Sequence, residues 1–286
     1  MRLQIGNFPR RLDLEARLAI GGALGFGSSS IGVLNGEVDR YLATHSVGDL
    51  KDAFTRNKIA LANVWAGPLY EHDGDLWVQK LREVKPRLEL IAEVGGRQVA
   101  INTPMGWPKQ PDSHDWGWLV SKYREYADLL TQFGLELVLE YIGPHLAAPI
   151  RGSLVVYPFV DNLNRALELV QRIDRPNVGL ILDVMHWWAG GSTHEDLHKV
   201  KGLPLALHFF DIRKGAVRET AHDSDDRVLP GEGMIDLVGF LRVLKQDGFD
   251  GDVLPELIGL EEFLEADSWE GPKKIRDVYL GILEKA

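Results

Sequence analysis

Residues 178–184 read VGLILDV, a run of apolar side chains in which an acid, Asp183, stands at the end. An unbroken apolar run of this length is typical of a parallel strand whose two faces are both buried. A charged group in such a place needs a partner or a function. Three other runs end in the same way: LELVLE (135–140) in Glu140, LALH (205–208) in His208, and DVLPE (252–256) in Glu256. The four polar side chains can meet only if these strands lie side by side and point the same way, as in an α/β barrel.

Eight such runs occur along the chain, and helical patterns separate them. The runs are LQIGNF (3–8), SSSIGVL (28–34), IALANVW (59–65), RQVAINTP (97–104), LELVLEYIG (135–143), VGLILDV (178–184), LALHFFDI (205–212) and DVLPELIG (252–259). Helical spacing occurs twice, first in Leu163, Ala166, Leu167, Val170 and Ile173, then in Met234, Leu237, Val238, Leu241 and Leu244, with Gly248 as a stop. The glycine-rich residues 21–30 fit a loop, a helix end or a strand start. Strands that alternate with helices predict a single closed (β/α)₈ TIM barrel formed by residues 1–286.

The composition argues against a nucleic-acid-binding or membrane protein. Hydrophobic residues make up 45% of the 286 positions, charged residues 26%, and the formal net charge is −10. An acidic chain without a long Lys/Arg run is a poor match for a phosphate backbone. No apolar stretch is long enough to cross a bilayer, and the first residues lack the pattern of a secretory signal. We therefore expect a cytoplasmic protein.

The chain contains no cysteine, so a metal ion could be held only by carboxylate and imidazole groups. Ligands of these types suit Mn²⁺, Mg²⁺, Co²⁺ or Zn²⁺. Each acid also has a plainer interpretation, because a strand-end Asp or Glu often caps the next helix or pairs with an arginine. Their joint placement favours the metal site.

Five stretches together resemble the xylose isomerase-like TIM barrel superfamily, a group of sugar phosphate isomerases and epimerases. They are LELVLEYIGPH (135–145), VGLILDVMHWWAGG (178–191), LALHFFDIRKG (205–215), DRVLPGEGMIDL (226–237) and DVLPELIG (252–259). The motifs cover the C-terminal half, and the order of strands and helices extends the resemblance over the whole chain. The resemblance weakens where the third and fourth strands end, in VWAGP and NTPMGWP, so the resemblance itself implies no substrate contacts from the first half.

The resemblance implies a single divalent metal ion bound by Glu140, Asp183, His208 and Glu256. It also implies that Glu140 and Glu256 act as acid and base on a sugar, and that His186 faces the substrate. The expected reaction is isomerisation or epimerisation of a carbohydrate or polyol ketone, through proton abstraction next to a carbonyl and a metal-stabilised enediolate. Members of this group are often homo-oligomers, and some related eliminating enzymes have a partner subunit.

Four further residues are candidates for substrate binding. Arg213 could hold a substrate oxygen or phosphate, although a solvated basic side chain fits the sequence almost as well. Trp65 and Trp107 lie at or beyond strand ends, where an aromatic ring could contact a sugar, and packing in the core is the plain alternative. His145 follows the fifth strand and could reach the substrate, or could be an ordinary loop histidine.

Other functions compete with an isomerase. A lyase would use the same first step and then eliminate a group from the neighbouring carbon, as dehydratases of inosose or dehydroshikimate do, or as enzymes that cleave oxidised glycosides do. Residues 194–198 (HEDLH) match the zinc protease pattern, but the short segment between GGST and Gly202 offers no third ligand. The apurinic endonucleases of the superfamily need extra metal ligands that are missing here. A binding module would keep the pocket without needing two carboxylates beside one metal.

Overall fold

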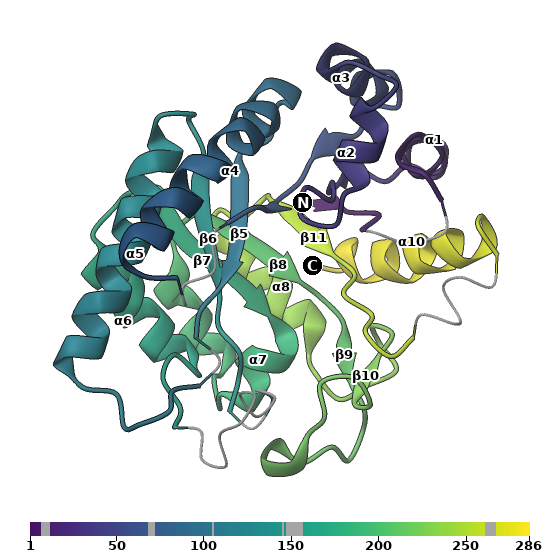
Figure 1. Ribbon diagram of the computed structural model, residues 1–286. Helices are drawn as coiled ribbons and strands as arrows, with labels where there is room; N and C mark the ends of the chain where they lie inside the picture. Colours follow the sequence, from purple (N-terminus) through teal and green to yellow (C-terminus); the bar gives the residue numbers. More distant parts are fainter. Residues whose placement is uncertain (7–11, 68–71, 105, 145, 147–156, 261–266) are drawn as a thin grey trace.

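The computed structural model describes residues 1–6, 12–67, 72–104, 106–144, 146, 157–260 and 267–286 (Figure 1). Its barrel strands are β1 (Arg2–Leu3), β2 (Ser28–Ser29), β3 (Ala60–Leu61), β4 (Val64–Trp65), β5 (Gln98–Asn102), β6 (Glu136–Glu140), β7 (Val178–Asp183), β8 (Leu205–His208) and β11 (Asp252–Leu254). They pair in parallel in the order β1-β11-β8-β7-β6-β5-β4, and β2 pairs with β3. Each of the eight predicted runs contains strand residues, although several of the strands are shorter than the runs.

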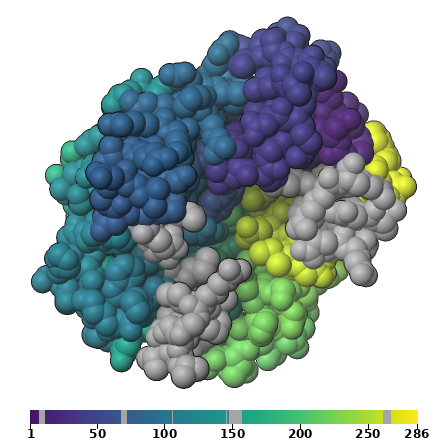
Figure 2. Space-filling view, in the orientation of Figure 1, coloured from purple at the N-terminus to yellow at the C-terminus, as the bar shows by residue number. Residues whose placement is uncertain are grey.

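The barrel closes between β1 and β2. Gln4 forms a parallel bridge with Ser28, and the Ile5 amide donates to the Ser28 carbonyl at 3.0 Å. Strands β3 and β4 are the two ends of one predicted strand, residues 59–65. The ends of the chain therefore meet, and helices α1 and α10 are in contact. Figure 2 shows the purple N-terminal and yellow C-terminal segments side by side. The fold is a TIM barrel, as predicted.

Helices surround the strands (Figure 1). They are α1 (Leu14–Leu24), α2 (Glu37–Leu42), α3 (Val47–Arg56), α4 (Gly74–Val94), α5 (Ser113–Thr131), α6 (Leu163–Ile173), α7 (Val184–Ala189), α8 (Leu237–Gln246) and α10 (Glu270–Leu283), with 3-10 turns at His194–Val200 and Arg218–Thr220. None of these helices in the described part of the chain could span a membrane. The ambiguous glycine-rich segment contains the end of α1, a left-handed Gly25 (φ 82°) and then β2.

The structure corrects the sequence analysis at two places. Helix α8 begins at Leu237 and not at Met234, because the side chain of Asp236 caps it by accepting a hydrogen bond from the Gly239 amide at 2.9 Å. The seventh predicted strand stops at His208, and residues 211–212 form β9 (Asp211–Ile212) of a separate antiparallel pair with β10 (Arg227–Val228). This β9–β10 pair places Arg227 beside the barrel mouth.

The alternation of side chains along the strands points the polar strand ends into the barrel. Ala100, Val138, Ile181 and Ala206 form a small inner cluster, against which Trp65 packs. Their neighbours, such as Leu139 and Leu182, belong to the large core shared with the helices. Since side chains two positions apart share a face, Glu140, Asp183 and His208 follow the inner residues and also point inward. The inner pattern therefore brings the polar residues together at one end of the barrel.

Gly179 is the position where a side chain should damage the barrel most directly. A Cβ added there would lie 1.8 Å from the backbone oxygen of Pro204, because β7 and β8 are closely paired. We expect Gly179→Ala to lower the free energy of unfolding by about 1–3 kcal/mol, the range for overpacked cores. Gly117 on α5 is a matched control, because a Cβ there meets no atom within 4 Å. Gly117→Ala should raise stability by up to about 1 kcal/mol in denaturant unfolding; an equally mild effect of Gly179→Ala would contradict the close approach.

Candidate metal centre

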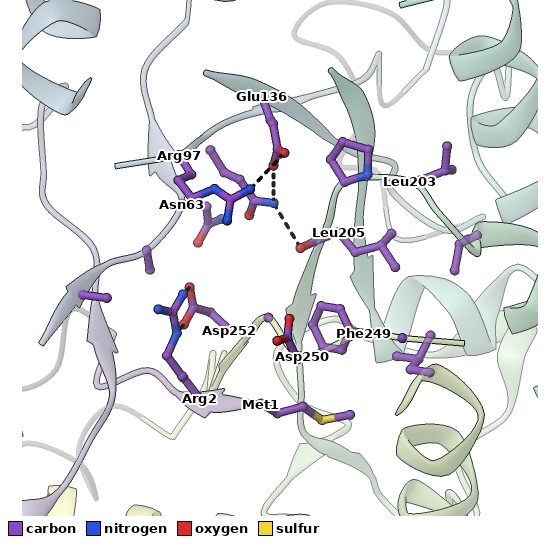
Figure 3. A pocket seen from close by; sticks show the side chains of 18 of the residues that line it. Met1, Arg2, Asn63, Arg97, Glu136, Leu203, Leu205, Phe249, Asp250 and Asp252 are labelled. Carbon is purple, nitrogen blue, oxygen red and sulfur yellow. Dashed lines mark hydrogen bonds and ion pairs between the residues drawn. The ribbon is translucent and has the colours of Figure 1, made fainter. Parts of the chain in front are cut away.

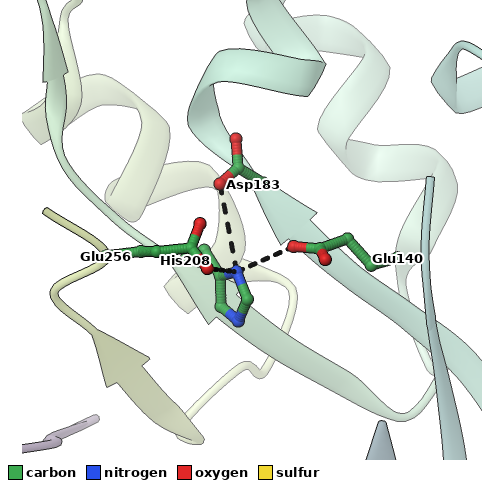
Figure 4. Close-up of side chains that lie close together, drawn as sticks. All are labelled: Glu140, Asp183, His208 and Glu256. Carbon is green, nitrogen blue, oxygen red and sulfur yellow. Dashed lines mark ion pairs between the residues drawn. The ribbon is translucent and has the colours of Figure 1, made fainter. Parts of the chain in front are cut away.

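The four predicted ligands meet at the carboxyl ends of the strands. Glu140, Asp183 and His208 are the last residues of β6, β7 and β8, and Glu256 comes two residues after the end of β11. One ligand atom from each of the four lies within 4.8 Å of all the others. Pro255 lies just beyond β11, so its missing N–H removes no bond from that strand. Figure 4 shows the three carboxylates around the His208 ring.

The imidazole of His208 contacts the acids without being hydrogen-bonded to them. Its Nδ1 atom lies 2.8 Å from Glu140 Oε1, 3.2 Å from Glu256 Oε1 and 3.9 Å from Asp183 Oδ2. Nevertheless both ring nitrogens, and Glu140 Oε1, are buried atoms that lack a hydrogen-bond partner. Buried polar atoms without partners are costly. The imidazole nitrogen and the carboxylate oxygens are close to one another but do not have hydrogen-bond geometry. This arrangement fits a cation that all of these atoms would bind.

The electrostatics of the cluster favour a positive charge at its centre. Burial opposes a charge on His208, but the carboxylates of Glu256 and Glu140 outweigh it and hold the pKa of the imidazole well above its usual value. Burial raises the pKa of Asp183 to about 7. For Glu256, burial is outweighed by His208 and Arg227, and its pKa lies well below the usual range. Metal ligands must be deprotonated, so a divalent cation would displace the proton from His208.

Arg227 is a part of the centre that the sequence analysis did not identify. Its Nη1 atom donates to Glu256 Oε2 at 2.8 Å and to the Glu256 carbonyl at 2.9 Å, and it lies 3.5 Å from Asp183 Oδ2. The buried Asp211 of β9 holds the loop that follows β10 by accepting from the amides of Gly231, Gly233 and Ile235 at 3.0–3.1 Å. The stretch DRVLPGEG contains Arg227, but nothing in the sequence reveals its distance from the ligands.

Asn102, the last residue of β5, is a second such residue. Its Nδ2 atom donates to Glu140 Oε2 at 2.9 Å, while Glu140 Oε1 faces His208. The amide therefore fixes the rotation of the carboxylate and leaves one oxygen directed at the centre. Its inward position could have been inferred from the alternation in QVAIN, but its partner could not.

His186 lies next to the centre, in α7. Asp183 caps this helix, and its Oδ1 atom accepts from the His186 amide at 3.0 Å. The imidazole is buried, and its Nδ1 atom lies 3.9 Å from the same oxygen without a hydrogen bond. The helix cap thus holds His186 beside Asp183, which is one of the four predicted ligands.

The predicted substrate-binding residues fall into different places. Trp65 is partly buried against the inner cluster of the barrel, where it can form a wall of the mouth. Trp107 is partly buried and packs against Trp118 of α5 and against Phe159, with ring centroids 5.6 and 5.2 Å apart. Arg213 pairs with Asp226 at 2.5 Å and contributes to the β9–β10 pair. His145 lies outside the described residues.

The HEDLH segment does not form a zinc site. It lies in the 3-10 turn His194–Val200, where His194 Nε2 lies 2.9 Å from the Asp236 carbonyl and His198 Nδ1 lies 2.5 Å from Asp247 Oδ2. Each histidine therefore has its own partner on or beside α8. Among the residues that the structure describes, the only group of three or more potential metal ligands is the one at the barrel mouth.

A hollow of about 640 Å³ lies at the opposite end of the barrel (Figure 3). Its lining includes Arg2, Gln98, Glu136 and Asp252, which are the first residues of four strands. Arg2 and Asp252 are paired at 2.9 Å, and Gln98 bonds to Glu136 at 3.0 Å. These polar groups satisfy one another. In a TIM barrel this end serves stability, and the chemistry lies at the carboxyl ends of the strands.

Three comparisons with known proteins agree with this geometry. A family model described as a xylose isomerase-like TIM barrel matches residues 24–277. An inosose isomerase from Halalkalibacterium halodurans is 26% identical over 251 residues, which cover 87% of this chain and 84% of that protein. The structure of a xylose isomerase domain protein from Alicyclobacillus acidocaldarius superposes with a TM-score of 0.83 at 25% identity, covering 99% of this chain and 97% of that one. The crystal structure of the IOLI protein with a binding zinc atom has a TM-score of 0.82 at 24% identity, with 100% and 99% covered, and shares the fold.

Proposed function

Because this chain belongs to the xylose isomerase-like TIM barrel family, we propose that it is a metal-dependent isomerase or epimerase that acts on a cyclic polyol ketone of the inosose type. The observation that carries this proposal is the meeting of three carboxylates and one imidazole at the mouth of the barrel. The inosose isomerase that matches most of both chains supports the substrate class. The resemblance seen in the motifs of the C-terminal half extends to the whole fold.

Glu140, Asp183, His208 and Glu256 would hold the divalent ion. When bound, such an ion polarises the carbonyl and a neighbouring hydroxyl of the ketone, and so acidifies the hydrogen on the carbon between them. Oxygen and imidazole ligands without a thiolate suit Mn²⁺, Mg²⁺, Co²⁺ or Zn²⁺, and we propose Mn²⁺ as the native ion.

The two glutamates would carry the proton. In the order of the sheet, β7 and β8 separate β6 from β11, so Glu140 and Glu256 approach the centre from different strands. One carboxylate removes the hydrogen from the α-carbon, and the other returns a proton to the neighbouring position or to the opposite face. His186 would donate a hydrogen bond to a substrate oxygen, and Trp65 would pack against the apolar face of the ring.

The proposal is tested by NMR of the metal-loaded protein with a panel of inososes and ketoses in D₂O. Deuterium in a rearranged or epimerised product is the expected result. Deuterium uptake followed by loss of water would show the lyase outcome of the same first step. A protein that holds its metal and exchanges no hydrogen in any member of the panel would contradict the proposal.

Two further properties are proposed on the resemblance and the composition alone, namely assembly into a homo-oligomer and a cytoplasmic location. Light scattering of the purified protein would measure the first, and fractionation of the source cells would test the second.

A further inference from the structure

Arg227 presents a fixed positive charge to the metal ligands. We propose that this residue sets the charge preference of the centre, making it selective for divalent over trivalent cations. The inference rests on the metal centre of the proposed function and deepens it. Arg227 acts through Glu256 and Asp183, so it is a positioning and selectivity residue and not a catalytic one.

The guanidinium has no freedom to leave its place. The residue is only 2% exposed, and its Cζ atom lies 3.9 Å from the centroid of the Phe210 ring, over which it stacks. Nη1 donates a hydrogen bond to Glu256. Nε donates to the carbonyl of Asp223 at 2.7 Å, and Nη2 donates to the carboxylate of Asp223 at 2.6 Å. A guanidinium also keeps its proton at any ordinary pH. The charge is therefore permanent in both place and sign.

The fixed charge of Arg227 changes the net charge of the metal-bound centre. The three carboxylates of Glu140, Asp183 and Glu256 supply a charge of −3, so a divalent ion leaves −1 and a trivalent ion leaves zero. Arg227 adds +1, which makes the divalent centre neutral and leaves the trivalent centre with an excess positive charge. A net charge inside a buried site is costly. Without the arginine the centre would be neutral with a trivalent ion, and with the arginine it is neutral with a divalent ion.

Asp223 offsets only part of this effect. Its side chain is 34% exposed, and it meets the guanidinium through Nε and Nη2, not through the Nη1 atom that bonds to Glu256. A charge in contact with water is screened more strongly than one buried among the ligands. Neutralising Asp223 should therefore strengthen the influence of Arg227 and favour divalent ions further.

The ratio of two affinities isolates this electrostatic effect. Replacing Arg227 also removes support from Glu256, which weakens the binding of any ion. Because that loss is common to both ions, it largely cancels in the ratio of the Mn²⁺ dissociation constant to that of Tb³⁺. The electrostatic repulsion between Arg227 and the bound ion does not cancel in this ratio, because it is proportional to the charge of the ion and is therefore larger for Tb³⁺ than for Mn²⁺.

The experiment measures Mn²⁺ binding by electron paramagnetic resonance and Tb³⁺ binding by luminescence, on metal-free full-length protein without substrate. Arg227→Met should raise the ratio of the Mn²⁺ to the Tb³⁺ dissociation constant about tenfold or more. Arg227→Lys, which keeps the charge, should bind both ions more weakly with the ratio nearly unchanged. Arg17→Met is the matched control, because Arg17 is equally buried and is paired at 2.5 Å with Glu37, which is not one of the four ligands.

Asp223→Asn keeps the test decisive if Arg227→Met does not fold, because it should lower the same ratio. An unchanged ratio in Arg227→Met, or in Asp223→Asn where the first variant is unfolded, would overturn the selectivity role and leave the metal centre standing. Wild-type protein that binds neither ion would overturn the centre, the proposed function and this inference together.

Discussion

Replacing Glu140 or Glu256 by glutamine should slow exchange of the α-hydrogen by about a thousandfold, within the range seen for loss of a general acid or base. Glutamine keeps the size of the side chain, and at position 140 it can still accept from Asn102, which lies 2.9 Å from Glu140 Oε2. It cannot accept a proton from carbon. The rate of deuterium uptake by NMR, measured at saturating metal, separates this loss from weaker metal binding.

Glu136→Gln is the control for these variants. Glu136 lies on the same strand and the same face as Glu140, but at the other end of β6, where it bonds to Gln98 at 3.0 Å. The control should exchange the hydrogen at the wild-type rate, and all three variants should keep their circular dichroism. If either Glu140→Gln or Glu256→Gln retained near-normal exchange, the acid–base role of that residue would be wrong.

Replacing His208 by alanine should remove most of the affinity for divalent metal. His208 Nδ1 is the atom that approaches all three carboxylates, at 2.8–3.9 Å, and alanine would leave the ion with one donor fewer. We expect a loss larger than the 10–100-fold that is typical when a residue outside the ligand shell is replaced. Metal at about 100 times its dissociation constant should stabilise the wild-type protein by about 2.7 kcal/mol.

The difference in metal affinity between the wild-type protein and His208→Ala is measured as the shift in melting temperature when metal is added. For a protein of this size the wild-type shift should be about 4–5 °C, and His208→Ala should show almost none. His198→Ala is the matched control, because His198 lies in the HEDLH segment and is paired with Asp247 at 2.5 Å. A full metal-induced shift in His208→Ala would mean that the ion is bound elsewhere.

The strands and the meeting of Glu140, Asp183 and His208 could be predicted from the sequence because both depend on local patterns. A buried strand such as VGLILD is recognised as an apolar run. Because side chains alternate between the two faces of a strand, Asp183 points to the same face as Ile181, which is the inside of the barrel. Parallel strands that end at one rim then bring their final residues together. The same logic explains why Glu140 and His208 were found.

What could not be predicted depends on contacts between segments distant in the sequence. Arg227 reaches Glu256 only because β10 pairs with β9 after the chain has left the barrel. The packing of Trp107 against Phe159, which lies in another loop, could not be read from the sequence either. Met234 fits the helical spacing, although the capping side chain of Asp236 starts the helix later. In each case the outcome depends on a tertiary contact or a cap that the local pattern does not show.

The most direct test of the central claim is to locate the metal ion. Crystals of the protein grown with Mn²⁺ or Co²⁺ and measured at the absorption edge of that metal give an anomalous difference map. We predict one strong peak per chain, bonded to Glu140, Asp183, His208 and Glu256. A peak at another place, or no peak at this cluster from protein that binds the metal in solution, would contradict the account.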